Sequence, residues 1–205
     1  MDAADIRTLS NSWMPDDDWQ RTTIEAVERG GTSTPAFNLE DFDAAKVSTD
    51  TGFALPEGHQ GNIAHSIWEN LQTFLEEVIP VAEKRGVKLA LHPNCPPIDD
   101  LNGQDRIITI LGAMRRVVEL MPCDIIGLCF CQGKFASRGG LDITSFIEKL
   151  APHITMAHVR DVTGEIPSFE ESLIDNGKTD MVGYIEGYLN FPNEFVICTE
   201  HVLTL

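Results

Sequence analysis

The sequence has 205 residues, of which 42% are hydrophobic, so it can bury one core and suits a single domain over residues 1–205. Its formal net charge of −17 disfavours nucleic acid and anionic membrane surfaces as partners, because both would be repelled. No apolar run approaches the length of a membrane span, the N-terminus is acidic and the five cysteines include no CxxC pair, so we expect a cytoplasmic protein with reduced thiols.

The first part of the chain combines one strand-like run with a long irregular stretch. Residues 6–13 are predicted to form a strand, which ends where Pro15 and a run of aspartates interrupt regular structure. Residues 30–62 are rich in Gly, Pro, Ser, Thr and Asp and carry only fragments of an apolar pattern. We predict an irregular insertion there, with residues 39–45 as a candidate short helix.

From Ile67 onward, helical and strand-like segments alternate. Apolar residues recur at steps of three and four up to Ala82, which predicts an amphipathic helix that Gly86 ends. Further helices are predicted over residues 106–119, 142–150 and 181–189. Apolar strand-like runs occupy residues 87–91, 125–130, 154–157 and 195–199. This alternation predicts a parallel sheet with right-handed crossovers.

The ends of these four runs favour a barrel. Each run leads into a residue that can bind a metal: His92, Cys131, His158 and Glu200. In a (β/α)8 barrel the active site is built at the carboxyl ends of the parallel strands. Because only five strands can be placed, we predict a partial (β/α)8 TIM barrel with flanking helices that lacks about three strands, the first ones included.

The same four residues predict a metal site. Their spacing fits one strand and helix for each interval, so all four would point into one barrel mouth. Two imidazoles, a thiolate and a carboxylate disfavour Mg²⁺ and Ca²⁺ and admit Fe²⁺, Mn²⁺ or Zn²⁺. Cys129 is the alternative to Cys131, because it lies two residues earlier and shares its side-chain face, but Cys131 is nearer the strand end.

Further polar residues are candidates for catalysis and substrate binding. His201 adjoins Glu200 and would face the same cavity, so it is the candidate acid or base, with a surface position as the alternative. Arg21, Arg138 and Arg160 each follow a strand end closely and are candidate partners for a substrate carboxylate, or else neutralise the acidic surface. The remaining histidines are predicted to be surface residues: His59, His65 and His153.

Six short motifs carry a resemblance to a known family. They lie at residues 11–22, 69–83, 88–93, 127–133, 158–160 and 168–172. Together they resemble the mannonate dehydratases, metal-dependent lyases of the xylose-isomerase-like barrel class. The resemblance implies loss of water from D-mannonate, a small anionic sugar acid, to give 2-dehydro-3-deoxy-D-gluconate in hexuronate catabolism. It also implies Mn²⁺ or Fe²⁺ at His92, Cys131, His158 and Glu200.

The chain departs from the family pattern at several positions. Glu200 stands where the family has an aspartate, which makes this ligand one methylene longer, and Glu170 stands where the family has a histidine. The catalytic tyrosine expected beyond His201 does not occur within these 205 residues. Three functions therefore stay open: a dehydratase, a sugar isomerase or epimerase of the same barrel class, and a partial relative that binds metal without catalysis. Homo-oligomerisation also stays open.

Overall fold

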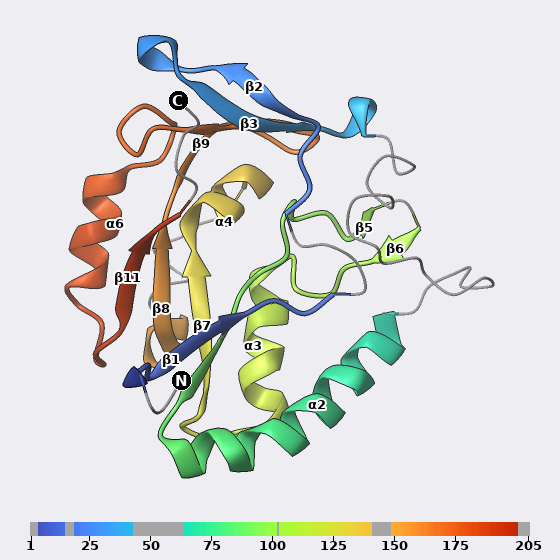
Figure 1. Cartoon of the computed structure of the whole chain (residues 1–205), viewed down its shortest axis with the longest axis vertical. Helices are drawn as coiled ribbons and strands as arrows, with labels where there is room; N and C mark the ends of the chain where they lie inside the picture. Colours follow the sequence, from blue (N-terminus) through green and yellow to red (C-terminus); the bar gives the residue numbers. More distant parts are fainter. Residues whose placement is uncertain (1–3, 15–18, 43–63, 102, 141–148, 201–205) are drawn as a thin grey trace.

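The chain folds around a sheet of five parallel strands (Figure 1), in a computed structural model that describes residues 4–14, 19–42, 64–101, 103–140 and 149–200. The strand order in space, β1-β4-β7-β8-β11, is also the order along the chain. The strands span Thr8–Asn11, Lys88–Leu91, Ile126–Cys131, Ile154–Val159 and Val196–Thr199. A parallel sheet built in chain order is one side of a barrel, so the predicted partial (β/α)8 barrel with about five strands is confirmed.

Three helices pack on the outer face of this sheet. They are α2 (Ala64–Arg85), α3 (Leu111–Leu120) and α6 (Met181–Tyr188), and each corresponds to a predicted helix. Gly86 ends α2 as expected, with a φ of 61° that suits glycine. None of the helices in the described residues is long and apolar enough to cross a membrane. Of the predicted helix over residues 142–150, residues 141–148 lie outside the described part of the chain.

Helix α3 begins at Leu111 rather than at Arg106, where the sequence predicts its start. The residues between them bond to the preceding loop instead of forming a helical turn. The Arg106 N–H donates to the Asp99 carbonyl and the Ile108 N–H donates to the Asn94 side chain, both at 2.8 Å.

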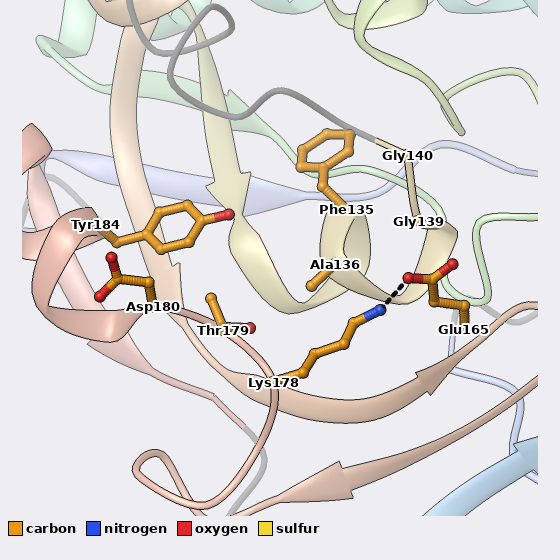
Figure 2. Close-up of a pocket in the computed structure, with 9 residues that line it drawn as sticks. All are labelled: Phe135, Ala136, Gly139, Gly140, Glu165, Lys178, Thr179, Asp180 and Tyr184. Atoms are coloured by element: carbon orange, nitrogen blue, oxygen red, sulfur yellow. Dashed lines mark hydrogen bonds and ion pairs between the residues drawn. The ribbon is translucent and has the colours of Figure 1, made fainter.

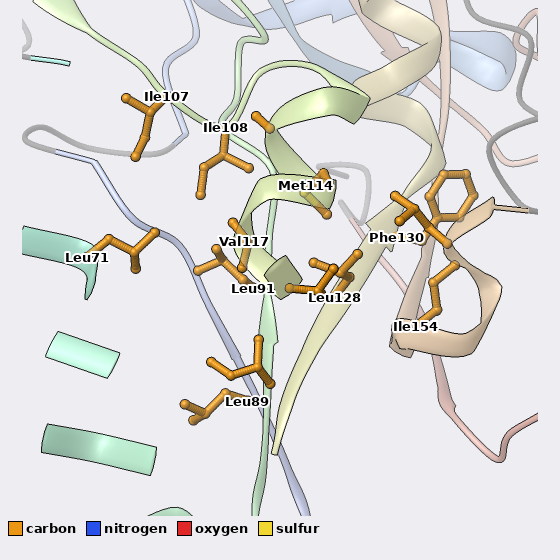
Figure 3. Close-up of a cluster of buried hydrophobic side chains, with 14 of the residues drawn as sticks. Leu71, Leu89, Leu91, Ile107, Ile108, Met114, Val117, Leu128, Phe130 and Ile154 are labelled. Carbon is orange, nitrogen blue, oxygen red and sulfur yellow. The ribbon is translucent and has the colours of Figure 1, made fainter. Parts of the chain in front are cut away.

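The main hydrophobic core lies between the sheet and these helices (Figure 3). Leu71 from α2, Met114 from α3, and Leu89 and Leu128 from the sheet are all almost fully buried. Every residue of β7 is buried, as is typical of an apolar strand in a parallel sheet that is covered on both faces.

A second sheet crosses the carboxyl ends of the parallel strands (Figure 1). It is antiparallel, with the order β2-β3-β10-β9. Its strands span Thr23–Val27, Ser33–Asn38, Ser168–Ser172 and Asp161–Glu165. The short elements around the two sheets are η2 (Arg29–Gly31), η3 (Leu39–Asp41), β5 (Asp100–Leu101), β6 (Gln104–Asp105), α4 (Gln132–Arg138) and η4 (Ala151–His153).

Strand β3 corrects the prediction of an irregular insertion over residues 30–62. It is regular because its inner residues are buried against β10, where Phe37 stacks on Phe169 with ring centroids 5.8 Å apart. Strand β3 also pairs with the nearby strand β2, but β10 lies far along the chain, so local composition gave no sign of this burial. Of the candidate helix over residues 39–45, residues 39–41 form η3, and the insertion beyond residue 42 lies outside the described residues up to Ala64.

Two Gly→Ala substitutions, one in the packing of β7 against β8 and one on the surface of α3, are predicted to have opposite effects. A Cβ at Gly127 would lie 2.3 Å from Thr155 Oγ1, so Gly127→Ala should lower the free energy of unfolding by about 1–3 kcal/mol. Gly112 is exposed in α3, and its nearest neighbour would be 3.8 Å away, so Gly112→Ala should raise that free energy by about 0.5–1 kcal/mol. Urea unfolding followed by circular dichroism measures both; a Gly127→Ala protein as stable as the parent would contradict this packing.

Candidate metal centre

Four potential metal ligands meet at the carboxyl edge of the parallel sheet. His92 follows β4, Cys131 ends β7, His158 lies in β8 and Glu200 follows β11. Strand register brings them level, because Cys131 pairs with His158 across β7 and β8. One ligand atom from each residue lies within 4.8 Å of all the others. The structure therefore brings together all four residues that the sequence predicts as ligands.

The carboxylate of Glu200 is the centre of this group. Its Oε2 lies 2.9 Å from Cys131 Sγ, and its Oε1 lies 3.0 Å from His158 Nδ1 and 3.5 Å from His92 Nε2. The approach of the buried His158 Nδ1 lacks the geometry of a hydrogen bond, although the atoms are close. Such crowding of two nitrogens, a sulfur and a carboxylate fits residues that point at a common cation, and this donor set suits Mn²⁺, Fe²⁺ or Zn²⁺.

Burial and the Glu200 charge shift the protonation of the other ligands. Burial, followed by the Glu200 carboxylate, raises the pKa of the Cys131 thiol. Burial alone would lower the pKa of His158, but its hydrogen bond to Cys129 and its contact with Glu200 raise that pKa above its ordinary value. Burial also raises the pKa of Cys129, the alternative cysteine, which contacts His158. A metal cation that binds here must therefore displace protons from sulfur and imidazole.

Lys134 is a buried cation beside the centre that sequence reasoning missed. It lies on α4 and is 1% exposed. Its Nζ is 3.0 Å from His92 Nδ1 and donates to the Pro93 carbonyl at 2.8 Å. The second nitrogen of a ligating histidine usually donates to an acceptor, whereas an ammonium can only donate, so Lys134 can bond to Nδ1 only while that nitrogen carries no proton. The sequence does place a lysine three residues after Cys131. Its contact with His92, however, depends on the helical turn between Cys131 and Lys134, which the sequence did not reveal.

Helix α4 is held close to Arg160. A Cβ built on Gly133 would lie 2.7 Å from Arg160 Cγ and 2.9 Å from its Cδ. The backbone of α4 therefore rests directly on the methylene stem of this arginine.

The predicted substrate-binding arginines divide into two groups. Arg21 and Arg160 both donate to the buried carboxylate of Glu171, which the sequence did not single out beyond its place in the motif at 168–172. Arg21 also contacts Cys95 Sγ at 3.2 Å. Burial alone would raise the pKa of Cys95, but Arg21, Lys134 and Arg160 together lower it.

Arg138 belongs to a different contact. Its guanidinium pairs with Asp99 at 3.1 Å, beside the Pro97 carbonyl.

The remaining histidine predictions can be compared in part: His65 and His153 are exposed as expected, whereas His59 and the candidate acid or base, His201, lie outside the described residues.

The fold and the contacts among the four candidate ligands define a class of protein. A half-barrel of parallel strands with candidate metal ligands at their carboxyl ends is the arrangement of a metal-dependent barrel protein. The family model described as D-mannonate dehydratase (UxuA) matches residues 1–205. The chain therefore belongs to the mannonate dehydratase family, as its motifs indicate.

Individual relatives agree with this assignment. The mannonate dehydratase of Shouchella clausii (strain KSM-K16) is 29% identical over 177 residues, which cover 76% of this chain and 49% of that protein. The mannonate dehydratase of Streptococcus suis (strain 05ZYH33) is 30% identical over 219 residues, which cover 97% of this chain and 59% of the relative.

Solved structures extend the comparison. The crystal structure of mannonate dehydratase from Streptococcus suis serotype 2 matches all of this chain and 60% of its own, with a TM-score of 0.86 and 26% identity. A D-tagatose 3-epimerase-like protein, at 21% identity and a TM-score of 0.54, shares the fold. The chain thus spans about half to three fifths of the mannonate dehydratases that it matches.

Substitution of Cys131 tests the ligand set. Cys131→Ala should weaken Mn²⁺ binding by more than about 100-fold, because it removes one of four candidate ligands. Cys123→Ala is the matched control, since Cys123 is an exposed free cysteine and should leave binding unchanged. Calorimetric titration and metal content after dialysis measure the effect. Loss of binding in Cys129→Ala, with Cys131→Ala unaffected, would assign the ligand to Cys129 instead.

Metal affinity should rise with pH. Because the pKa values of Cys131 and His158 are both raised, each carries a proton near about pH 6 that the metal must displace. Each displaced proton should strengthen binding about tenfold per pH unit until the group loses its proton without metal. Titrations between about pH 6 and pH 8, in buffers of different ionisation enthalpy, count the protons released. An affinity that is independent of pH would contradict these protonation states.

Proposed function

We propose that this chain carries the metal centre of a mannonate dehydratase, which removes water from D-mannonate to give 2-dehydro-3-deoxy-D-gluconate in cytoplasmic hexuronate catabolism. The observation that carries the proposal is the convergence of His92, Cys131, His158 and Glu200 at the carboxyl edge of a half-barrel whose whole length matches that family. The metal is Mn²⁺ or Fe²⁺, held by these four residues.

The reaction requires removal of a weakly acidic proton next to a carboxylate and departure of a hydroxyl group from the adjacent carbon. When bound, the metal would supply positive charge where negative charge develops on the substrate oxygens. His201 directly follows Glu200 in the chain, so it is our candidate for moving the proton. Lys134 contacts His92 at Nδ1, so it bears on which nitrogen of this ring carries the proton.

A sugar acid also needs a local cation, because the whole chain carries a net charge of −17. Arg21 and Arg160 share the single carboxylate of Glu171, so this cluster keeps a net positive charge while Cys95 is a thiol. A planar guanidinium can bind a carboxylate through two parallel hydrogen bonds. We assign the substrate carboxylate to this pair, with Arg138 as the third candidate.

The test is a direct assay of the 205-residue chain. Purified protein loaded with Mn²⁺ or Fe²⁺ should convert D-mannonate to a 2-keto-3-deoxy acid, detected by mass spectrometry as a loss of water. Glu200→Gln should reduce the rate by more than about 100-fold, because it removes the charged ligand that contacts the other three. Cys123→Ala is again the matched control.

Two outcomes would contradict the dehydratase proposal. One is the absence of product from folded, metal-loaded protein, which would favour a relative that binds metal without catalysis. The other is interconversion of sugars without loss of water, which would favour an isomerase or epimerase of the same barrel class.

A further inference from the structure

Cys95 is a fully buried cysteine within the cluster of Arg21, Arg160 and Glu171, and no step of the proposed reaction involves it. It lies in the loop that follows β4. Arg21 Nη2 donates to its Sγ at 3.2 Å, and Arg160 Nη1 donates to the same atom at 3.7 Å. The sulfur of a thiol is a weak acceptor, and hydrogen bonds between ionised groups are the stronger ones. Two guanidinium donors on one sulfur therefore favour a thiolate.

The buried charges of this cluster do not balance unless that sulfur is ionised. The side chains of Arg21, Arg160 and Glu171 are each at most 2% exposed. Two guanidiniums thus share one carboxylate, and among the described residues neither of them bonds to a second one. Cys95 also packs in a buried hydrophobic cluster with Phe169, where an unbalanced charge is costly. Because buried charges are normally paired, a second anion is required here.

The charged groups that act on Cys95 come from four parts of the chain. They are Arg21 before β2, Lys134 on α4, Arg160 after β8 and Glu171 in β10. Burial raises the pKa of the Cys95 thiol, and so does Glu171, but the three cations outweigh both and lower it below its ordinary value. With Cys95 ionised, three cations face two anions, so the cluster still carries the positive charge that a sugar acid needs.

We propose that Cys95 is a thiolate at neutral pH and forms a pH-dependent link between the loop after β4 and the antiparallel sheet. The thiolate accepts from Arg21 and Arg160, and both guanidiniums donate to Glu171 of β10. Protonation of the sulfur leaves the two guanidiniums with one carboxylate, so the antiparallel sheet opens more readily. The link involves neither metal nor substrate, so it is independent of the proposed dehydratase chemistry.

The ionisation is tested by the ultraviolet absorbance of the thiolate. At about pH 7 the parent should show the absorbance of one thiolate more than Cys95→Ser at equal metal content. It should lose this absorbance on unfolding in urea, because a free thiol has a pKa of about 8.5. The thiols of Cys129 and Cys131 do not contribute, since burial raises the pKa of both. Cys123→Ala, which removes an exposed cysteine, is the matched control and should match the parent.

The link is tested by hydrogen exchange of the backbone amides in β3 and β10. At about pH 8, Cys95→Ser should exchange there at least about tenfold faster than the parent, as expected for loss of a hydrogen bond between charged groups. As the pH falls through the lowered pKa of Cys95, the parent loses this stabilisation and the two proteins should converge. Cys95→Asp keeps the negative charge and should restore the slow exchange at about pH 8.

An exposed ion pair on the same sheet provides the comparison. Lys178 pairs with Glu165 of β9 at 2.6 Å (Figure 2). Lys178→Ala should change the exchange by less than about fivefold, because an exposed pair contributes little to stability. The proposal is overturned if Cys95→Ser exchanges no faster than Lys178→Ala, or if the folded parent shows no thiolate absorbance that unfolding removes. The second result needs no variant, so it decides the question even if Cys95→Ser does not fold.

Discussion

The candidate centre depends on one geometric constraint: parallel strands in register end at the same edge of a sheet. Cys131 and His158 are direct partners across β7 and β8, and the Glu200 N–H continues the ladder by bonding to the Val159 carbonyl. Residues far apart in sequence therefore arrive within reach of one carboxylate without any loop having to place them. Since the ladder fixes Glu200, a shift of β11 by one residue would turn its side chain to the other face and dismantle the group.

The antiparallel sheet covers the same edge of the parallel sheet. Its strand β10 supplies Glu171, which receives both Arg21 and Arg160, and so ties this sheet to the carboxyl end of β8. Removing one partner of a buried ion pair leaves the other charge unpaired in a low-dielectric interior. This lowers the free energy of unfolding far more than loss of a surface pair does. The cluster therefore fixes the position of the second sheet as well as the local charge.

Much of the barrel, and the membership of the candidate ligand set, could be predicted from sequence. Strand β7 is buried throughout and β4 is buried except at Lys88, so both are largely apolar runs. Because sites in such sheets lie at the carboxyl ends of the strands, these runs then point to His92 and Cys131. Strand β3 pairs with its neighbour β2 but is buried against β10, which lies about 130 positions further along the chain, so its local composition did not predict it. Lys134 was missed because α4 has only 7 residues, too few for a periodic pattern to reveal which side faces His92.

The contact between Gly133 and Arg160 has a mechanical consequence. Helix α4 leaves β7 immediately after Cys131, and its backbone rests on the arginine stem with no side chain in between. A side chain added at position 133 would press on the stem of Arg160, because a close-packed contact leaves no space for it. Either α4 or Arg160 would then have to shift, which would disturb the contact of Lys134 with His92 or that of Arg160 with Glu171.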